Sequence, residues 1–303
     1  MSTAAIPGAP LPVRTPGSRA RGRHRRPERP EVPAGAPALV LAVPAEATPE
    51  AVAVVNELLS VIRGEQPGIE AAAGWLPGPS AAEAAQAAEG ETGGQPTIPT
   101  VESLLGAAAE AGLPAPVLVP LLFGPHPYLP QLQQLAADTG ALLTDVLGPH
   151  PLLAEAVHVR LSEAGLARAD RARLFAIATS ADGVVLTTVG GEEAAAAAGI
   201  TGVLLAARLA VPVVAAALDV PGSVAGAVEH LRATGSQRPA LAPLVIGPEA
   251  AGDLLLGASE QTGCPSAAPL GAYPTVGQLV ASAYLAALPA PVEEDPQEPA
   301  EQA

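Results

Sequence analysis

The chain has 303 residues, of which 49% are hydrophobic but only 2% aromatic, and its formal net charge is −15. This length predicts two domains. The low aromatic content predicts that their cores consist of alanine, valine and leucine. No stretch approaches the roughly 18 uncharged apolar residues that a membrane helix requires, so we expect no membrane span. The single cysteine, Cys264, excludes an internal disulfide and favours a reducing compartment, the cytoplasm.

Residues 1–37 form an arm that is rich in proline and arginine and carries a charge of about +5. The basic residues of the arm are Arg14, Arg19, Arg21, Arg23, Arg25, Arg26 and Arg29. We expect a disordered, solubilising arm without a partner, and its charge leaves contact with RNA, lipid or the acidic body as alternatives. Residues 38–303 carry −20, which argues against nucleic-acid binding by the folded part because phosphate contacts need clustered cations.

The first half alternates short apolar runs with amphipathic stretches, which predicts strands alternating with helices. Its first strand, residues 38–43, is followed by Thr48 and Pro49, a cap and a first-turn proline that begin a helix. The other expected strands cover 69–75, 117–123 and 141–147, and the other expected helices cover 100–112, 129–138 and 151–163. Residues 77–99, rich in alanine, glycine and glutamate, are predicted to be an insertion.

The second half repeats this order of elements. Its expected strands cover 174–178, 211–218 and 240–246, and its expected helices cover 192–209, 223–234, 250–262 and 275–288. Asp182-Gly183 and Gly190-Gly191 are interpreted as turns. Residues 289–303 form an acidic tail that we expect to be disordered.

Two segments repeat each other at a constant spacing of 123 residues. Val119-Pro-Leu-Leu-Phe-Gly-Pro125 aligns with Ala242-Pro-Leu-Val-Ile-Gly-Pro248, and without a gap Leu147-Gly148 then aligns with Leu270-Gly271. This unit is longer than the roughly 20 to 50 residues of a solenoid repeat. The repeat therefore predicts two tandem homologous domains, residues 38–165 and 172–288, each with a parallel sheet covered by helices on both faces.

The same segments carry a family resemblance. Val-Pro-Leu-Leu-Phe-Gly at 119–124, Leu-Gly-Pro-His-Pro-Leu-Leu-Ala-Glu-Ala at 147–156 and Leu-Gly-Ala-Tyr-Pro at 270–274 resemble the sirohydrochlorin chelatase family, over residues 38–288. Members insert cobalt or iron into a tetrapyrrole during cobalamin or siroheme biosynthesis. The resemblance implies an α/β fold of two tandem chelatase-like domains, each a parallel four-stranded sheet flanked by helices. It also implies a tetrapyrrole partner and a divalent metal as substrate.

The chemistry of the family rests on two histidines, and this chain departs from the pattern at the first. The resemblance places Pro44 on the histidine of a His-Gly-Ser motif and Glu46 on its serine, and proline neither binds metal nor transfers protons. The second histidine falls on Tyr128 without gaps, or on His126 after a shift of two residues. At the spacing of 123, Glu249 matches His126.

We therefore predict His126, Glu46 and Glu249 as the metal residues, because insertion needs a ligand that holds the ion and a base that removes pyrrole protons. In parallel sheets ligands bind beyond the carboxyl ends of the strands, so the loops 43–48 and 124–128 should be neighbours. The alternative interpretation is that all three residues are structural. Glu46 would then be a solvated acid before a helix, His126 a rigid loop residue, and Glu249 an acid in the first turn of a helix.

Two hypotheses for the function follow. The first is a metal chelatase, a lyase that acts on sirohydrochlorin or a relative, with His126 as the surviving ligand. The second is a catalytically silent homologue that binds a tetrapyrrole, a metal or a protein partner, and Pro44 motivates it. A chain without lysine has no glycine-rich phosphate loop of the usual kind, so we expect no nucleotide cofactor. His150, matched by Tyr273, is interpreted as structural.

Overall fold

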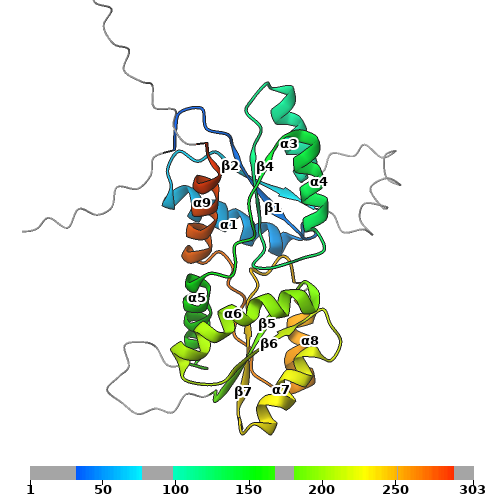
Figure 1. Ribbon diagram of the computed structural model, residues 1–303, viewed down its shortest axis with the longest axis vertical. Helices are drawn as coiled ribbons and strands as arrows, with labels where there is room; N and C mark the ends of the chain where they lie inside the picture. Colours follow the sequence, from blue (N-terminus) through cyan, green and yellow to red (C-terminus); the bar gives the residue numbers. More distant parts are fainter. Residues whose placement is uncertain (1–31, 77–97, 168–180, 251, 290–303) are drawn as a thin grey trace, which may run out of the picture. The chain divides into compact units, whose positions relative to one another are not determined.

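The computed structural model describes residues 32–76, 98–167, 181–250 and 252–289, and contains two parallel sheets flanked by helices (Figure 1). The first half comprises β1 (Leu39–Val43), α1 (Pro49–Glu65), β2 (Ala71–Trp75), α3 (Val101–Glu110), β3 (Val117–Pro120), α4 (Leu129–Thr139), β4 (Leu142–Leu143) and α5 (Pro151–Glu163). The second half comprises β5 (Gly183–Thr188), α6 (Gly191–Leu209), β6 (Val213–Ala217), α7 (Ser223–Ala233), β7 (Pro239–Pro243), α8 (Gly252–Thr262) and α9 (Pro274–Ala287). Most of the arm, the insertion and the acidic tail, and the strand expected at 174–178, lie outside the described residues.

The first sheet has the strand order β2-β1-β3-β4 and the second has the order β6-β5-β7, with all strands parallel. Parallel strands need cover on both faces, and the side chains of β1 alternate accordingly. Leu39 and Leu41 lie in the core cluster that also contains residues of α1 and α9, whereas Val40 and Ala42 pack with α3 and α4. The α/β architecture predicted from the alternating pattern is confirmed.

The central strand of the second sheet corrects the sequence interpretation. Gly183–Thr188 is not part of a turn but a buried strand that pairs with both β6 and β7. The Asp-Gly signal arises because Asp182 lies just before the strand, where its carboxylate accepts the N–H groups of Gln237 and Arg238 at 3.0 and 2.7 Å. The aspartate thus links the beginning of β5 to the beginning of β7 through hydrogen bonds.

The second sheet has three strands rather than the predicted four. In the first sheet, Leu142 donates its N–H to Pro116 at 3.1 Å and Thr144 donates to Leu118 at 2.9 Å. Only the second of these bonds has a counterpart 123 residues later, from Ala267 to Leu241 at 3.0 Å. Pro265 occupies the position that matches Leu142 and has no N–H to donate. The fourth strand is therefore reduced to an isolated bridge between Leu241 and Ser266.

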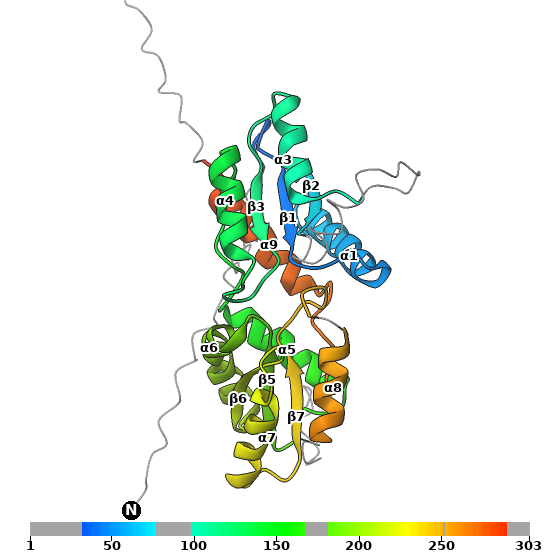
Figure 2. The same cartoon turned by 90° about the vertical axis from the view of Figure 1, so that its right-hand side faces the viewer.

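The helix that ends each half packs against elements of the other half. Helix α5 contacts α6 and β7, and α9 contacts α1 and β3 (Figures 1 and 2). Tyr284 of α9 is fully buried and donates its hydroxyl to the carbonyl of Pro37, just before β1, at 2.7 Å. A Cβ atom at Gly277 of α9 would lie 2.6 Å from Cγ1 of Val61, so glycine permits the close approach of α9 to α1. The first sheet is thus completed by the last helix of the described chain.

Helix α1 begins as the sequence predicts. The hydroxyl of Thr48 accepts the N–H of Ala51 at 3.2 Å, and Pro49 occupies the first turn, where its missing N–H costs nothing. This start fixes the end of the loop that follows β1. None of the helices in the described part of the chain is long and apolar enough to cross a membrane.

Candidate functional site

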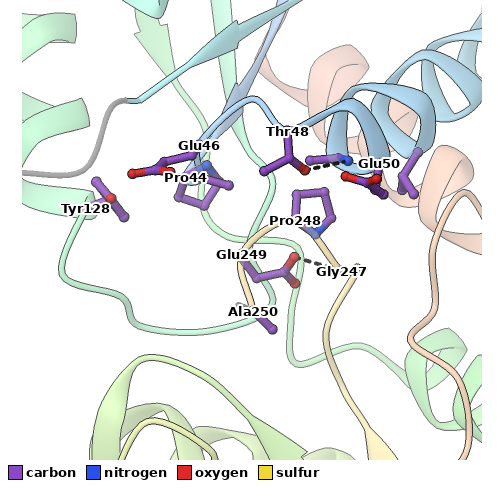
Figure 3. A pocket seen from close by; sticks show the side chains of 12 residues that line it. Pro44, Glu46, Thr48, Glu50, Tyr128, Gly247, Pro248, Glu249 and Ala250 are labelled. Atoms are coloured by element: carbon purple, nitrogen blue, oxygen red, sulfur yellow. Dashed lines mark hydrogen bonds between the residues drawn. The ribbon is translucent and has the colours of Figure 1, made fainter. Parts of the chain in front are cut away.

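A cavity of about 760 Å³ lies at the carboxyl ends of β1 and β7 (Figure 3). Three segments line it: the loop after β1 with the first turns of α1, the loop before α4, and the loop after β7. The lining residues are Pro44, Ala45, Glu46, Thr48, Glu50, Ala51, Val54, Tyr128, Gly247, Pro248, Glu249 and Ala250. This is the edge at which parallel sheets bind ligands, and the cavity has the size of a small-molecule site.

Glu249 is the most perturbed acid of the cavity. Its carboxylate accepts the backbone N–H groups of Ile246 and Gly247, the latter at 2.9 Å, and therefore turns back onto its own loop (Figure 3). Burial raises the pKa of Glu249 to about 7, and the backbone hydrogen bonds lower it by less than burial raises it. Near neutral pH this carboxyl group thus both takes up and releases a proton.

Glu46 and Tyr128 lie near each other in the wall of the cavity (Figure 3). The pKa of Tyr128 is raised mainly by burial and further by the negative charge of Glu46. The loops 43–48 and 124–128 are therefore neighbours, as expected for loops at the carboxyl ends of parallel strands. Oxygen donors of the cavity thus come from two loops of the first sheet and one loop of the second.

His126 is not among the described residues that line the cavity. Its ring stacks on that of Tyr128 with centroids 5.3 Å apart and 6° between the planes, and its Nδ1 accepts the N–H of Tyr128 at 3.4 Å. Its backbone lies against Gly190, at the beginning of α6. The pKa of His126 is lowered by burial, and the charge of Asp219 opposes this shift.

The structure thus brings two of the three predicted metal residues to one cavity. Glu46 and Glu249 both line it, whereas His126 stacks on Tyr128 and is not among the described lining residues. Within the described residues, no group of three or more histidine, cysteine, aspartate or glutamate side chains is placed to hold a metal ion. The assignment of these residues to metal chemistry stays a prediction.

The corresponding place in the second half is closed. By the strand register, Gly190 and Gly191 follow β5 as Ala45 and Glu46 follow β1. The carboxylate of Asp219 accepts their N–H groups at 2.8 and 3.1 Å. A side chain at Gly190 would clash with the carbonyl of Pro125, so the loop after β3 packs directly on the beginning of α6. Asp219 was not predicted from the sequence, although it follows β6 at the carboxyl edge of the sheet, where ligand-binding residues are expected.

Two further histidines have structural contacts. Nδ1 of His150 accepts the N–H of Leu152 at 3.2 Å and so caps α5, which confirms the structural interpretation of this residue. Its counterpart Tyr273 lies under the guanidinium group of Arg160, which is 5.1 Å from the ring centroid. His158 is buried in α5 and accepts a hydrogen bond from Nε of Arg208 at 2.9 Å, linking α5 to α6.

No family model matches the sequence, and no curated protein is significantly similar to it. Solved structures are similar in fold. Sirohydrochlorin chelatase SirB from Bacillus subtilis subspecies spizizenii, in complex with cobalt, superposes with a TM-score of 0.55 at 12% identity, covering 82% of this chain and 94% of that one. SirB from Bacillus subtilis with Fe3+ gives 0.57 at 13% identity, with the same coverage.

A third similar structure is CbiX, the terminal enzyme for biosynthesis of siroheme in denitrifying bacteria. It superposes with a TM-score of 0.52 at 17% identity, covering 84% of this chain and all of that one. All three comparisons extend over both sheets, because each covers more than four fifths of the chain. The chain therefore has the fold of the sirohydrochlorin chelatases.

Proposed function

We propose that this chain is a sirohydrochlorin chelatase-like protein of tetrapyrrole metabolism, which binds a macrocycle in the cavity at the ends of β1 and β7. The observation that carries the proposal is Glu249, a carboxyl group with a pKa of about 7 in a cavity of about 760 Å³. Metal insertion releases the pyrrole protons, and a base works best when its pKa lies near the working pH. Glu249 has this property.

The metal is a substrate in this proposal. Similar folds contain cobalt or Fe3+, and the carboxylates of Glu46 and Glu249 are donors that suit first-row metals. Glu46 would hold the incoming ion near the macrocycle, and Glu249 would accept a proton from a pyrrole nitrogen of the macrocycle. The phenol of Tyr128 lies beside Glu46 and adds a further oxygen donor to that wall.

Insertion of Co2+ or Fe2+ into sirohydrochlorin, followed by the absorbance of the macrocycle, tests the proposal. We expect Glu249→Gln to lower the rate at least about tenfold and to abolish the pH dependence near pH 7, because glutamine cannot take up the proton. Glu57→Gln is the matched control, since Glu57 is an exposed residue of α1 that does not line the cavity. A rate that is unchanged by Glu249→Gln would exclude this residue as the base.

A second candidate function is a silent homologue that binds the macrocycle without inserting a metal. It is favoured by the absence of His126 from the described lining of the cavity and by Pro44 at the family's first histidine. Equilibrium titration of sirohydrochlorin separates the two candidates: binding with no metal insertion at any pH supports the silent homologue. Binding with insertion supports the chelatase.

A further inference from the structure

Helix α6 carries an apolar stripe on the side that faces away from the second sheet, at the outside of the second half (Figures 1 and 2). Seven large hydrophobic residues are exposed in the described part of the chain, and three of them lie on this helix. They are Ile200, Val203 and Leu204, with exposed fractions of 56%, 70% and 38%. Ala196 and Ala207 are also exposed and extend the stripe in both directions.

The apolar stripe of α6 differs from the outer side of an ordinary surface helix, which carries charged and polar residues. Residues 194–207 contain no charged side chain. The five stripe residues follow the spacing i, i+4, i+7, i+8 and i+11, which is the spacing of one side of a helix that packs against another element. Contiguous apolar patches of this kind mark contact sites between proteins.

The charges at the two ends of α6 indicate which surface fits the stripe. Glu192 and Glu193 lie exposed in the first turn, and Arg208 lies exposed in the last turn, where its Nε donates to His158 at 2.9 Å. Glu192 and Arg208 are each eight residues away from Ile200, in opposite directions. Two antiparallel copies of α6 centred on Ile200 therefore set Glu192 of each copy opposite Arg208 of the other. Parallel copies would set like charges opposite each other.

We infer that the apolar stripe of α6 is a contact between two copies of this chain, which pack antiparallel across a two-fold axis at Ile200. A two-fold contact requires a self-complementary surface, and α6 is self-complementary in both its apolar side chains and its charges. The 19 residues of α6 span about 28 Å. A single pair of helices of this length buries less than the roughly 1,200 Å² of a standard interface, so the dimer is weak, with a dissociation constant on the order of 10 µM. The inference does not depend on the proposed function.

The test is the mass of the full chain in solution, measured by sedimentation equilibrium at concentrations from about 1 to 200 µM. We expect the mass to rise from that of one copy toward that of two. Ile200→Glu sets two carboxylates against each other at the axis and should weaken the dimer at least about tenfold. Leu256→Glu is the matched control, because Leu256 is 68% exposed on α8, and should leave the dimer unchanged. Thermal unfolding of both variants checks that the fold is kept.

The position of the axis and the direction of the helices are tested separately. Ile200→Cys should form a disulfide between two copies under mild oxidation, because a residue at the axis faces itself and a disulfide needs Cα atoms roughly 4.4–6.8 Å apart. Leu256→Cys should not, and the native Cys264 is buried. Glu192→Arg should weaken the dimer several-fold, because it sets an arginine opposite Arg208, whereas Glu57→Arg on α1 makes the same change of net charge and should not.

Two results overturn the inference. The first is a chain that keeps the mass of one copy at every concentration, in which case a different protein or another segment of this chain covers the stripe. The second is a dimer that Ile200→Glu leaves intact, or that Leu256→Glu weakens equally. A dimer that Glu192→Arg leaves unchanged contradicts the antiparallel order.

Discussion

Glu249 links the state of the cavity to pH. Its pKa is about 7 in the folded chain and about 4.5 without the fold, so between these values the folded state holds a proton that the unfolded state has released. The stability that this proton contributes is complete below pH 4.5 and is lost as the pH rises through 7. We expect a loss of about 1–3 kcal/mol over this range, given 1.36 kcal/mol for each pKa unit.

Glu249→Gln should remove this component, because glutamine does not titrate. The measurement is the free energy of unfolding in urea at several pH values from 4.5 to 7.5, for the wild type and the variant. The difference between them should change with pH, and the difference between the wild type and Glu57→Gln should stay nearly constant. A constant difference for Glu249→Gln would mean that its carboxyl group is not buried.

Asp219 is expected to influence His126 through its charge. Asp219→Asn keeps an oxygen that accepts a backbone N–H but removes the negative charge that raises the pKa of His126. The pKa of the histidine, measured by NMR titration of its ring protons, should therefore fall further below 6.5. Asp138→Asn, on the exposed side of α4, is the control and should leave the His126 titration unchanged. An unchanged titration in Asp219→Asn would show that the two side chains do not interact.

Part of the candidate site could be predicted from single residues of the sequence. Glu46 was indicated by the resemblance and Glu249 by the repeat spacing, and both lie in the cavity. The position of His126 could not be predicted, because it depends on how the loop after β3 packs against Gly190 in the other half of the chain. Sequence spacing places a residue on a loop, but it does not decide which of two neighbouring residues on that loop faces a cavity.

The start of α1 gives a test of how much a helix cap contributes to the stability of the chain. Thr48→Ala should destabilise the chain by about 1 kcal/mol, because the N–H of Ala51 loses its acceptor at the helix end. Thr48→Ser keeps the hydroxyl and should retain most of the stability. Both are measured by urea unfolding, and equal losses in the two variants would assign the effect to the methyl group rather than to the cap.

The contact between α1 and α9 gives a second test. Gly277→Ala should destabilise by about 1–3 kcal/mol, because the added methyl group meets Val61 in a packed interface. A methyl group added at Gly226 of α7 would meet open space, so Gly226→Ala should stabilise by about 0.5–1 kcal/mol through helix propensity. Thermal unfolding measures both changes, and stabilisation by both variants would mean that α9 does not approach α1 closely.

Helices were predicted better than strands, for a physical reason. Caps and the 3.6-residue period are local, so α1, α3 and α7 could be recognised from their own residues. Strand β5 is defined by its two neighbours in the sheet, and the turn signals Asp182-Gly183 and Gly190-Gly191 at its two ends conceal it. The reduced fourth strand could be explained only after pairing showed that Pro265 takes the position of a donor.

Helix α5 packs on the second half of the chain and α9 packs on the first. This exchange of helices between the halves predicts how the whole chain responds to cutting. A fragment of residues 1–167 contains the first sheet but lacks α9, so the apolar face of α1 and β3 would be exposed to water. We expect this fragment alone to aggregate, and to become soluble and well ordered when it is co-produced with residues 168–303. Size-exclusion chromatography and NMR spectra measure this. A monomeric, well-dispersed fragment 1–167 would contradict the exchange.

The same exchange sets an order of events during synthesis on the ribosome. A chain emerges from its beginning, and domains usually fold as their residues become available. Here the first sheet cannot cover its face until α9 has left the exit tunnel, and α9 is made after every other described element. The earliest strands must therefore wait, with apolar surface open to chaperones, until α9, which ends at Ala287, has emerged from the tunnel.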